Sequence, residues 1–220
     1  YSIATNIIGI GLIFANFGLN YGIFRFVPIF LGKNDIAKVK GVILFTFKRI
    51  TVLGIIVASI FFICSELIAV SLFNKPDLVQ YIKLFSFTIP ISALALIIST
   101  IFKGFNVIKY KVLIDDFIVI ISRILLFSCC LFFGLAVTGI IMSYLTSIFL
   151  GLIIGIILLL RVFPNIMNDS VKSEVNVREI TSYSYPLFLT SFFTIFLNRC
   201  DIMMLAYYLP ADQIGIYSIA

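Results

Sequence analysis

Residues 117 to 160 form an apolar stretch that contains a single charged side chain, Arg123. As one α-helix this stretch would be about 66 Å long, because each residue adds about 1.5 Å. The hydrocarbon core of a bilayer is only about 30 Å thick. We therefore predict two membrane-crossing helices, over about 114–137 and 140–160, which turn near 134–139.

The rest of the chain has the same character. Of its 220 residues 62% are hydrophobic and 12% are charged, and the mean hydropathy is +1.20, outside the range of soluble domains. Further apolar segments predict crossing helices over about 2–25, 50–73, 81–102 and 184–209, and a seventh after the turn at 209–215. Pro90 is expected to kink the helix over 81–102. The predicted fold class is all-α, a polytopic transmembrane helix bundle.

The residue types that common enzyme chemistry and metal sites need are scarce. His and Trp are absent, which removes the commonest general base. None of the four cysteines forms a CxxC pair, so no zinc site or disulfide framework is indicated. The sequence also has no P-loop, catalytic serine motif or metal-ligand cluster. We therefore expect neither an enzyme nor a cofactor, and we attribute the pI of about 9.2 to basic loops rather than to nucleic-acid binding.

Lysine and arginine predict the orientation of the bundle. Of the 16 Lys and Arg residues, 12 fall on one side of the predicted topology: Arg25, Lys33, Lys38, Lys40, Lys48, Arg49, Lys103, Lys109, Lys111, Arg161, Lys172 and Arg178. By the positive-inside rule that side is cytosolic. We expect a multi-pass protein of the cytoplasmic membrane, with a basic loop over 31–49 that attracts anionic lipid headgroups and a cytosolic linker over 162–183.

The tetrapeptide Tyr-Ser-Ile-Ala occurs at both ends of the chain, at 1–4 and at 217–220. Both copies fall at the entrance of a helix with the same predicted direction, and the residues between them contain six predicted crossings. Tandem six-helix lobes would produce this pattern. We interpret 1–161 as helices 2 to 6 of a first lobe without its helix 1, 162–183 as the interlobe linker, and 184–220 as helix 7 and the start of helix 8. On this interpretation the chain is part of a longer protein.

Three segments resemble a known family. They are "YPLFLTSFFTIFLNRCDIMMLAYYLPADQIGIYSIA" at 185–220, "FGLNYGIFRFVPIFLGKNDIAKVKG" at 17–41 and "FTIPISALALIISTIFKGFNVIKYKV" at 87–112. The first combines Arg-x-Asp in an apolar helix, a Pro-Ala-Asp turn and Gly-x-Tyr-Ser-x-Ala. Together they are similar to the polysaccharide-export flippases, the polysaccharide transport branch of the multidrug/oligosaccharidyl-lipid/polysaccharide exporter superfamily.

The resemblance implies a membrane flippase for cell-surface polysaccharide biosynthesis, such as that of O-antigen, capsule or exopolysaccharide. Its partner would be a polyprenyl-pyrophosphate-linked oligosaccharide, which it would translocate by alternating access without a covalent step. A cation, H⁺ or Na⁺, would couple the cycle. Two alternatives stay open: a cation-coupled multidrug exporter of the same superfamily, and a non-transporting membrane scaffold for polysaccharide synthesis.

Two arginines fall at mid-depth in predicted helices. Arg123 lies about 14 Å from the cytosolic end of its predicted helix and Arg199 about 20 Å beyond Pro186. A charged side chain at the centre of a helix in lipid costs about 2.5 to 3.5 kcal/mol. We expect Arg123 and Arg199 to face a water-filled cavity and bind the pyrophosphate; the alternative is that each pairs with a carboxylate and only holds helices together.

Three other charged residues, Asp201, Glu66 and Arg25, are candidates for ion coupling, ion pairing or substrate binding. Asp201 is two residues from Arg199, about 200° around a helix, so the two need different partners. Asp201 either binds the coupling ion or contacts a neighbouring helix, and Glu66 is a candidate for pairing or coupling. Arg25 either anchors its helix at the interface or contacts the substrate phosphate. The spacings Gly18-xxx-Gly22 and Gly151-xxx-Gly155 predict close contacts between helices.

Overall fold

The computed structural model describes residues 2–72, 74, 76, 78–132, 136–168 and 172–208. Every regular element in these ranges is a helix, as predicted. In chain order they are α1 (Ser2–Asn16), α2 (Leu19–Gly32), α3 (Ile36–Ile63), η1 (Leu67–Leu72), α4 (Leu78–Ser86), α5 (Thr88–Gly104), α6 (Ile108–Val112), η2 (Leu113–Ile118), α7 (Val119–Phe132), α8 (Ala136–Val162), η3 (Pro164–Ile166) and α9 (Val177–Tyr208).

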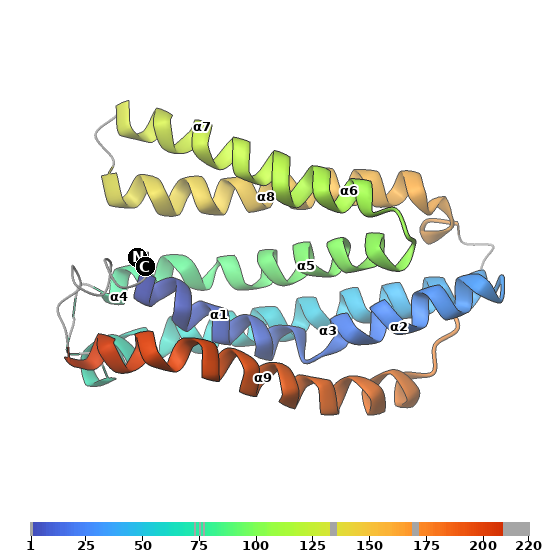
Figure 1. The fold of residues 1–220 in the computed structure, drawn as a ribbon, viewed down its shortest axis with the longest axis horizontal. Helices are drawn as coiled ribbons and strands as arrows, with labels where there is room; N and C mark the ends of the chain where they lie inside the picture. The colour runs from blue at the N-terminus through green and yellow to red at the C-terminus, as the bar shows by residue number, and fades with distance from the viewer. Residues whose placement is uncertain are drawn as a thin grey trace.

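The helices run up and down along one common axis (Figure 1). The α7–α8 hairpin forms one flank of the bundle, α9 forms the other, and α1 to α5 lie between them. Helix α5 is central, because it packs against α1, α2, α3 and α8. Its inward face, with Ile89, Ala93, Ile97 and Ile101, has no exposed surface.

Among the described residues, two of the predicted crossings have the length and composition of membrane spans by themselves, and up to four do if each bent helix pair counts as one span. Helix α3 and residues 139–162 of α8 qualify alone. The pairs α1–α2 and α4–α5 qualify if each bent pair is one span, with bends of 47° and 42°. The second bend confirms the predicted kink, because Pro90 has no N–H for the carbonyl of Ser86 and its ring would collide with that carbonyl in a straight helix.

Three helix starts were predicted too late. Helix α3 begins at Ile36 rather than near 50, α6 at Ile108 rather than near 114, and α9 at Val177 rather than 184. The segment predicted as a basic loop over 31–49 is therefore mostly the first half of α3. Lys and Arg are good helix formers, so a basic segment leaves the hydrocarbon core without leaving the helix. The turn before α3 is set by Asn34, at φ 55°, and by Asp35, whose side chain accepts a hydrogen bond from the Lys38 backbone N–H.

Both predicted glycine pairs lie at close helix contacts. Gly18 and Gly22 face α9, where an added Cβ at Gly18 would overlap the Ser184 carbonyl oxygen. Gly18 also has φ +71°, in the break between α1 and α2. A Cβ at Gly151 would come within 2.6 Å of Val119, and one at Gly155 within 3.0 Å of Ile98. Small residues therefore let these backbones approach, as expected in a membrane bundle.

The segment between α8 and α9 packs against the first half of α3. The Lys40 side chain is only 5% exposed, and its Nζ donates to the Asn168 carbonyl at 2.8 Å. The Glu174 backbone N–H donates to the Ala37 carbonyl at 3.2 Å, and Gly41 lies directly beneath Glu174. Within the segment predicted as an interlobe linker, Asn168 and Glu174 thus contact α3.

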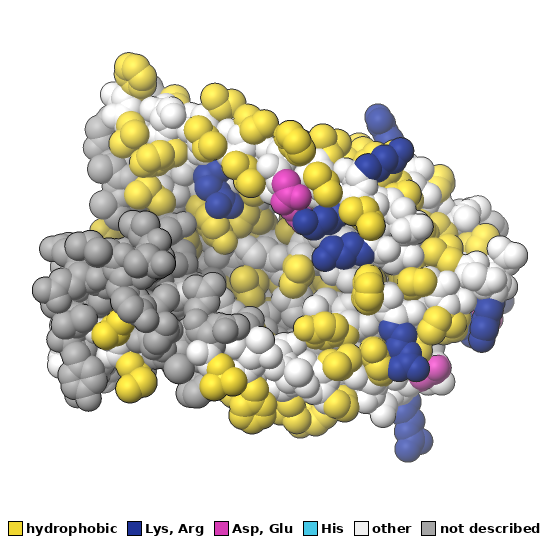
Figure 2. Space-filling view, viewed as in Figure 1, with side chains coloured by type: hydrophobic (Ala, Val, Ile, Leu, Met, Phe, Trp, Pro, Cys, Tyr) yellow, Lys and Arg dark blue, Asp and Glu magenta, His cyan; other side chains and the backbone are white. Residues whose placement is uncertain are grey.

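The connections α2–α3, α5–α6 and α8–α9 meet at one end of the bundle (Figure 1). On the face drawn in Figure 2, most Lys and Arg side chains gather in the half nearest that end. On this face, the described Lys and Arg side chains are thus concentrated toward one end, as the predicted topology requires. That this end faces the cytosol stays a prediction.

Replacement of Gly41 by alanine tests the docking of the linker. A Cβ there would overlap the Glu174 carbonyl, so we expect Gly41→Ala to lower the free energy of unfolding by about 1–3 kcal/mol, the usual cost of overpacking. Gly32→Ala is the matched control, because a Cβ at Gly32 meets nothing within 4 Å. Thermal unfolding of both variants in detergent measures the difference. Equal unfolding curves would contradict the docked arrangement.

The cap of α3 predicts a local pH dependence. The hydrogen bond from the Lys38 ammonium, followed by that from the Lys38 backbone N–H, lowers the pKa of Asp35 below its ordinary value of 3.8. The stabilisation by Asp35 is therefore complete above that ordinary value and is lost as pH falls through the lowered folded-state pKa. We expect Asp35→Ala to speed amide exchange in residues 36–40 at neutral pH. The difference from the unmodified protein, compared at the same pH, should shrink in strong acid.

Candidate functional site

Arg123 lies between α7 and α8 on one flank of the bundle. Its guanidinium carbon is 4.5 Å from the centre of the Tyr144 ring, within the range of a cation–π contact. Its Nε lies 3.5 Å from the Ser147 Oγ, at the limit of a hydrogen bond. The Ser147 hydroxyl donates to the Tyr144 carbonyl at 2.8 Å, so its oxygen is free to accept from Arg123. The two partners are three residues apart and therefore share one face of α8.

No carboxylate pairs with Arg123 among the residues that the structure describes. The cation–π contact and the long hydrogen bond leave the two terminal Nη atoms without a partner in that part of the chain. Arg123 is partly buried, so its N–H donors are partly shielded from solvent. Its charge is not neutralised by any described carboxylate. It can receive an anion in the fork geometry that guanidinium offers to phosphate.

The depth of Arg123 differs from the prediction because its helix begins earlier. Arg123 follows Ile108, the start of α6, by 15 residues, or about 22 Å. It precedes Phe132 at the far end by nine residues, or about 14 Å. Arg123 therefore lies farther from the end of the bundle that carries the α2–α3, α5–α6 and α8–α9 connections than the sequence predicted.

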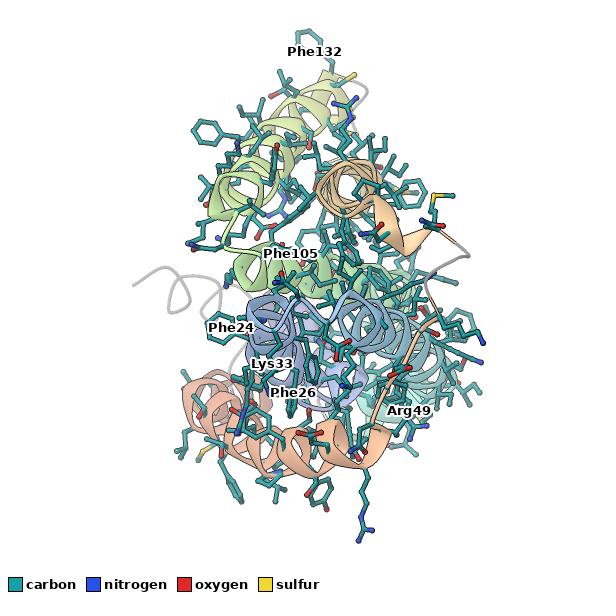
Figure 3. The ribbon with its side chains drawn as sticks, turned by 90° about the vertical axis from the view of Figure 1, so that its right-hand side faces the viewer. Phe24, Phe26, Lys33, Arg49, Phe105 and Phe132 are labelled. Atoms are coloured by element: carbon teal, nitrogen blue, oxygen red, sulfur yellow. The ribbon has the colours of Figure 1, made fainter. Side chains whose placement is uncertain are left out.

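Arg199 and Asp201 belong to α9, but their side chains lie outside the described residues. The backbone of Arg199 precedes Tyr208 by nine residues, the same spacing that separates Arg123 from Phe132. Helices α7 and α9 run in the same direction and lie on opposite flanks of the bundle (Figures 1 and 3). The structure therefore places the backbones of these two residues on helices at opposite flanks of the bundle.

Arg25 and Glu66 lie in different surroundings. The Arg25 guanidinium stacks on the Tyr183 ring at 4.2 Å and so connects α2 with α9. Phe26, labelled in Figure 3, lies beside this contact, with its ring 5.8 Å from that of Tyr183. Glu66 is exposed between α3 and η1, and it forms no ion pair with any described residue.

Asp115 makes polar contacts that were not predicted from the sequence. The Ser99 hydroxyl donates to Asp115 at 2.9 Å, which joins η2 to α5. Lys111 Nζ lies 3.8 Å from Asp115 and 3.5 Å from Asp116. The two adjacent acids lie at the start of the helix predicted over 114–137. From the sequence, nothing indicated that η2 would place Asp115 against α5. Lys111 offsets one of their two negative charges. No group of three or more potential metal ligands occurs in the described residues.

Comparison with known proteins agrees with this membrane architecture. No significant match was found among the curated proteins or among the solved structures. The family model described as "Polysaccharide biosynthesis protein" matches residues 1–220, the whole chain. A helical bundle with apolar spans and a match over its full length lead to one conclusion: the chain belongs to the polysaccharide biosynthesis protein family.

Proposed function

We propose that this protein is a flippase that carries a polyprenyl-pyrophosphate-linked oligosaccharide across the membrane by alternating access. Membership of the polysaccharide biosynthesis family is consistent with a membrane transporter. The observation that carries the finer proposal is Arg123, an arginine within an apolar helix whose Nη atoms have no carboxylate partner among the described residues.

The chemistry of the head group explains why such an arginine is useful. A pyrophosphate loses its hydration when it enters a low-dielectric region, and an isolated charge there is costly. A guanidinium offers paired N–H donors that match phosphate oxygens, and each charge-assisted hydrogen bond contributes more than a neutral one. The Tyr144 ring contacts one face of the guanidinium, which leaves its N–H edges available. Arg123 would thus stabilise the head group partway across.

The surroundings of Arg123 fit an open rather than a closed site. Helix α7 buries none of its side chains within the described bundle. Among the larger helices, its packing is mainly against α8. Its other surfaces are therefore available for a second lobe or a substrate. Arg199 and the coupling candidate Asp201 would contribute from α9 on the opposite flank, with H⁺ or Na⁺ as the coupling cation.

Removal of the Arg123 charge tests the proposal. The full-length protein is reconstituted in vesicles, and translocation of a polyprenyl-pyrophosphate-linked oligosaccharide is followed by its accessibility to an added glycosidase. We expect Arg123→Gln to slow translocation about 10- to 100-fold, because a hydrogen bond to a charged group contributes about 1.5–3 kcal/mol. The translocation rate of Arg123→Lys should lie between those of the unmodified protein and Arg123→Gln, because an ammonium keeps the charge but lacks the paired N–H donors.

Lys109→Gln is the matched control for that experiment. Lys109 is an exposed cation in α6, which leads through η2 into α7. Its replacement by Gln removes the same charge as Arg123→Gln, but away from the site. Equal slowing in Lys109→Gln and Arg123→Gln would refute a specific role for Arg123. Transport of cationic dyes instead of the lipid-linked sugar would identify a multidrug exporter. No transport by the unmodified protein would favour a scaffold.

A further inference from the structure

A pocket of about 450 Å³ opens between α3 and the α4–α5 break. Its wall on α3 consists of Ile55, Ala58, Ser59, Phe62 and Ile63, and its wall at the break consists of Ser86, Phe87 and Pro90. The pocket exists because α3 and α5 approach closely at Gly54 and Pro90, next to the break at which α4 bends away. A Cβ on Gly54 would lie 3.0 Å from the Pro90 Cα, and beyond this contact the 42° bend redirects α4.

The lining of the pocket is mainly apolar and exposed. Ile63, Phe87 and Ile55 are 78%, 57% and 54% exposed, so the described chain does not cover them. The two hydroxyls of the wall are satisfied by their own helices, since Ser59 donates to Ile55 and Ser86 to Lys83. No polar group of the wall therefore requires a polar ligand. An acyl chain matches this surface without leaving a donor or acceptor unpaired.

A cation lies beside the pocket. Lys83 Nζ is 5.8 Å from the centre of the Phe62 ring, and Phe62 in turn packs edge-on against Phe87 at 5.8 Å. Lys83 is the one charged residue of α4, it is exposed, and no carboxylate within the described ranges pairs with it. Charge complementarity therefore favours an anionic head group over a zwitterionic one.

The pocket faces away from the Arg123 site. Phe85 contacts the Tyr144 ring at 5.8 Å on the α8 side of α4, whereas Phe87 lines the pocket. Two residues apart, these side chains point in nearly opposite directions around the helix. A head group beside Lys83 therefore lies on the other side of α4 from the Tyr144 ring that contacts Arg123. The occupant is better matched by a lipid of the surrounding bilayer than by the transported molecule.

We propose that this pocket binds an anionic glycerophospholipid, with one acyl chain against the α3 wall and the phosphate beside the Lys83 ammonium. The lipid would fill the space that the break between α4 and α5 creates and would offset the Lys83 charge. This site is independent of the proposed transport activity.

Photolabelling tests the site directly. The full-length protein is placed in phosphatidylcholine vesicles that contain phosphatidylglycerol with a photoactivatable diazirine in its acyl chain, and the adducts are mapped by peptide mass spectrometry. We expect adducts within 55–63 and 86–90, in excess over those from a diazirine-bearing phosphatidylcholine. Lys83→Gln should reduce that excess about fivefold, since a lysine near an anionic head group contributes about 1 kcal/mol. Ser59→Phe, which fills the pocket, should reduce labelling by both lipids.

Lys33→Gln is the control, because Lys33 is an exposed lysine near the basic connections and away from the pocket (Figure 3). It should leave the labelling within 55–63 and 86–90 unchanged. Equal labelling by the two lipids, or an unchanged excess in Lys83→Gln, would overturn the proposal. So would displacement of the label by a polyprenyl phosphate but not by the same amount of unlabelled phosphatidylglycerol, because the site would then belong to the transported lipid class.

Discussion

Close approach of helix backbones at glycine is the interaction on which this bundle depends. In lipid, burial of an apolar side chain between helices gains little over its contact with acyl chains, so van der Waals packing between backbones must hold helices together. At Gly18 and Gly22, α9 packs closely against α1 and α2. At Gly151 and Gly155, α7 and α5 pack closely against α8, and at Gly54 Pro90 approaches α3. The same device at Gly41 admits the linker onto α3. These contacts fix which flank of the bundle each arginine-bearing helix occupies.

Charged side chains along the apolar helices have two kinds of partner. Lys111 lies close to both Asp115 and Asp116 and offsets one of their two negative charges, which joins η2 to α6. Arg123 and Lys83 instead contact aromatic rings, Tyr144 and Phe62, which attract a cation without neutralising it. A cation left with its charge in an apolar setting favours an anion. On this basis the two sites differ in occupant: a transported pyrophosphate at one and a bilayer phospholipid at the other.

Much of the fold could be predicted because it rests on local properties. The apolar segments, the kink at Pro90 and the two glycine spacings each follow from a few neighbouring residues, and the structure contains all three. The helix starts near 36, 108 and 177 were missed because hydropathy marks where a chain leaves the lipid, not where it leaves the helix. At the site, Arg123 could be found from its charge alone. Its partners Tyr144 and Ser147 could not, since they belong to another helix and carry no charge.

The sequence by itself determined that this chain is a membrane-spanning helical bundle and which side chains would be costly in lipid. Those properties add up residue by residue along each segment. Only the tertiary structure decided that Arg123 meets Tyr144, that Arg199 lies on a helix at the opposite flank, and that the linker lies on α3. Such contacts join residues far apart in the chain, and they depend on which face each helix turns toward its neighbour, which the composition of a single helix does not specify.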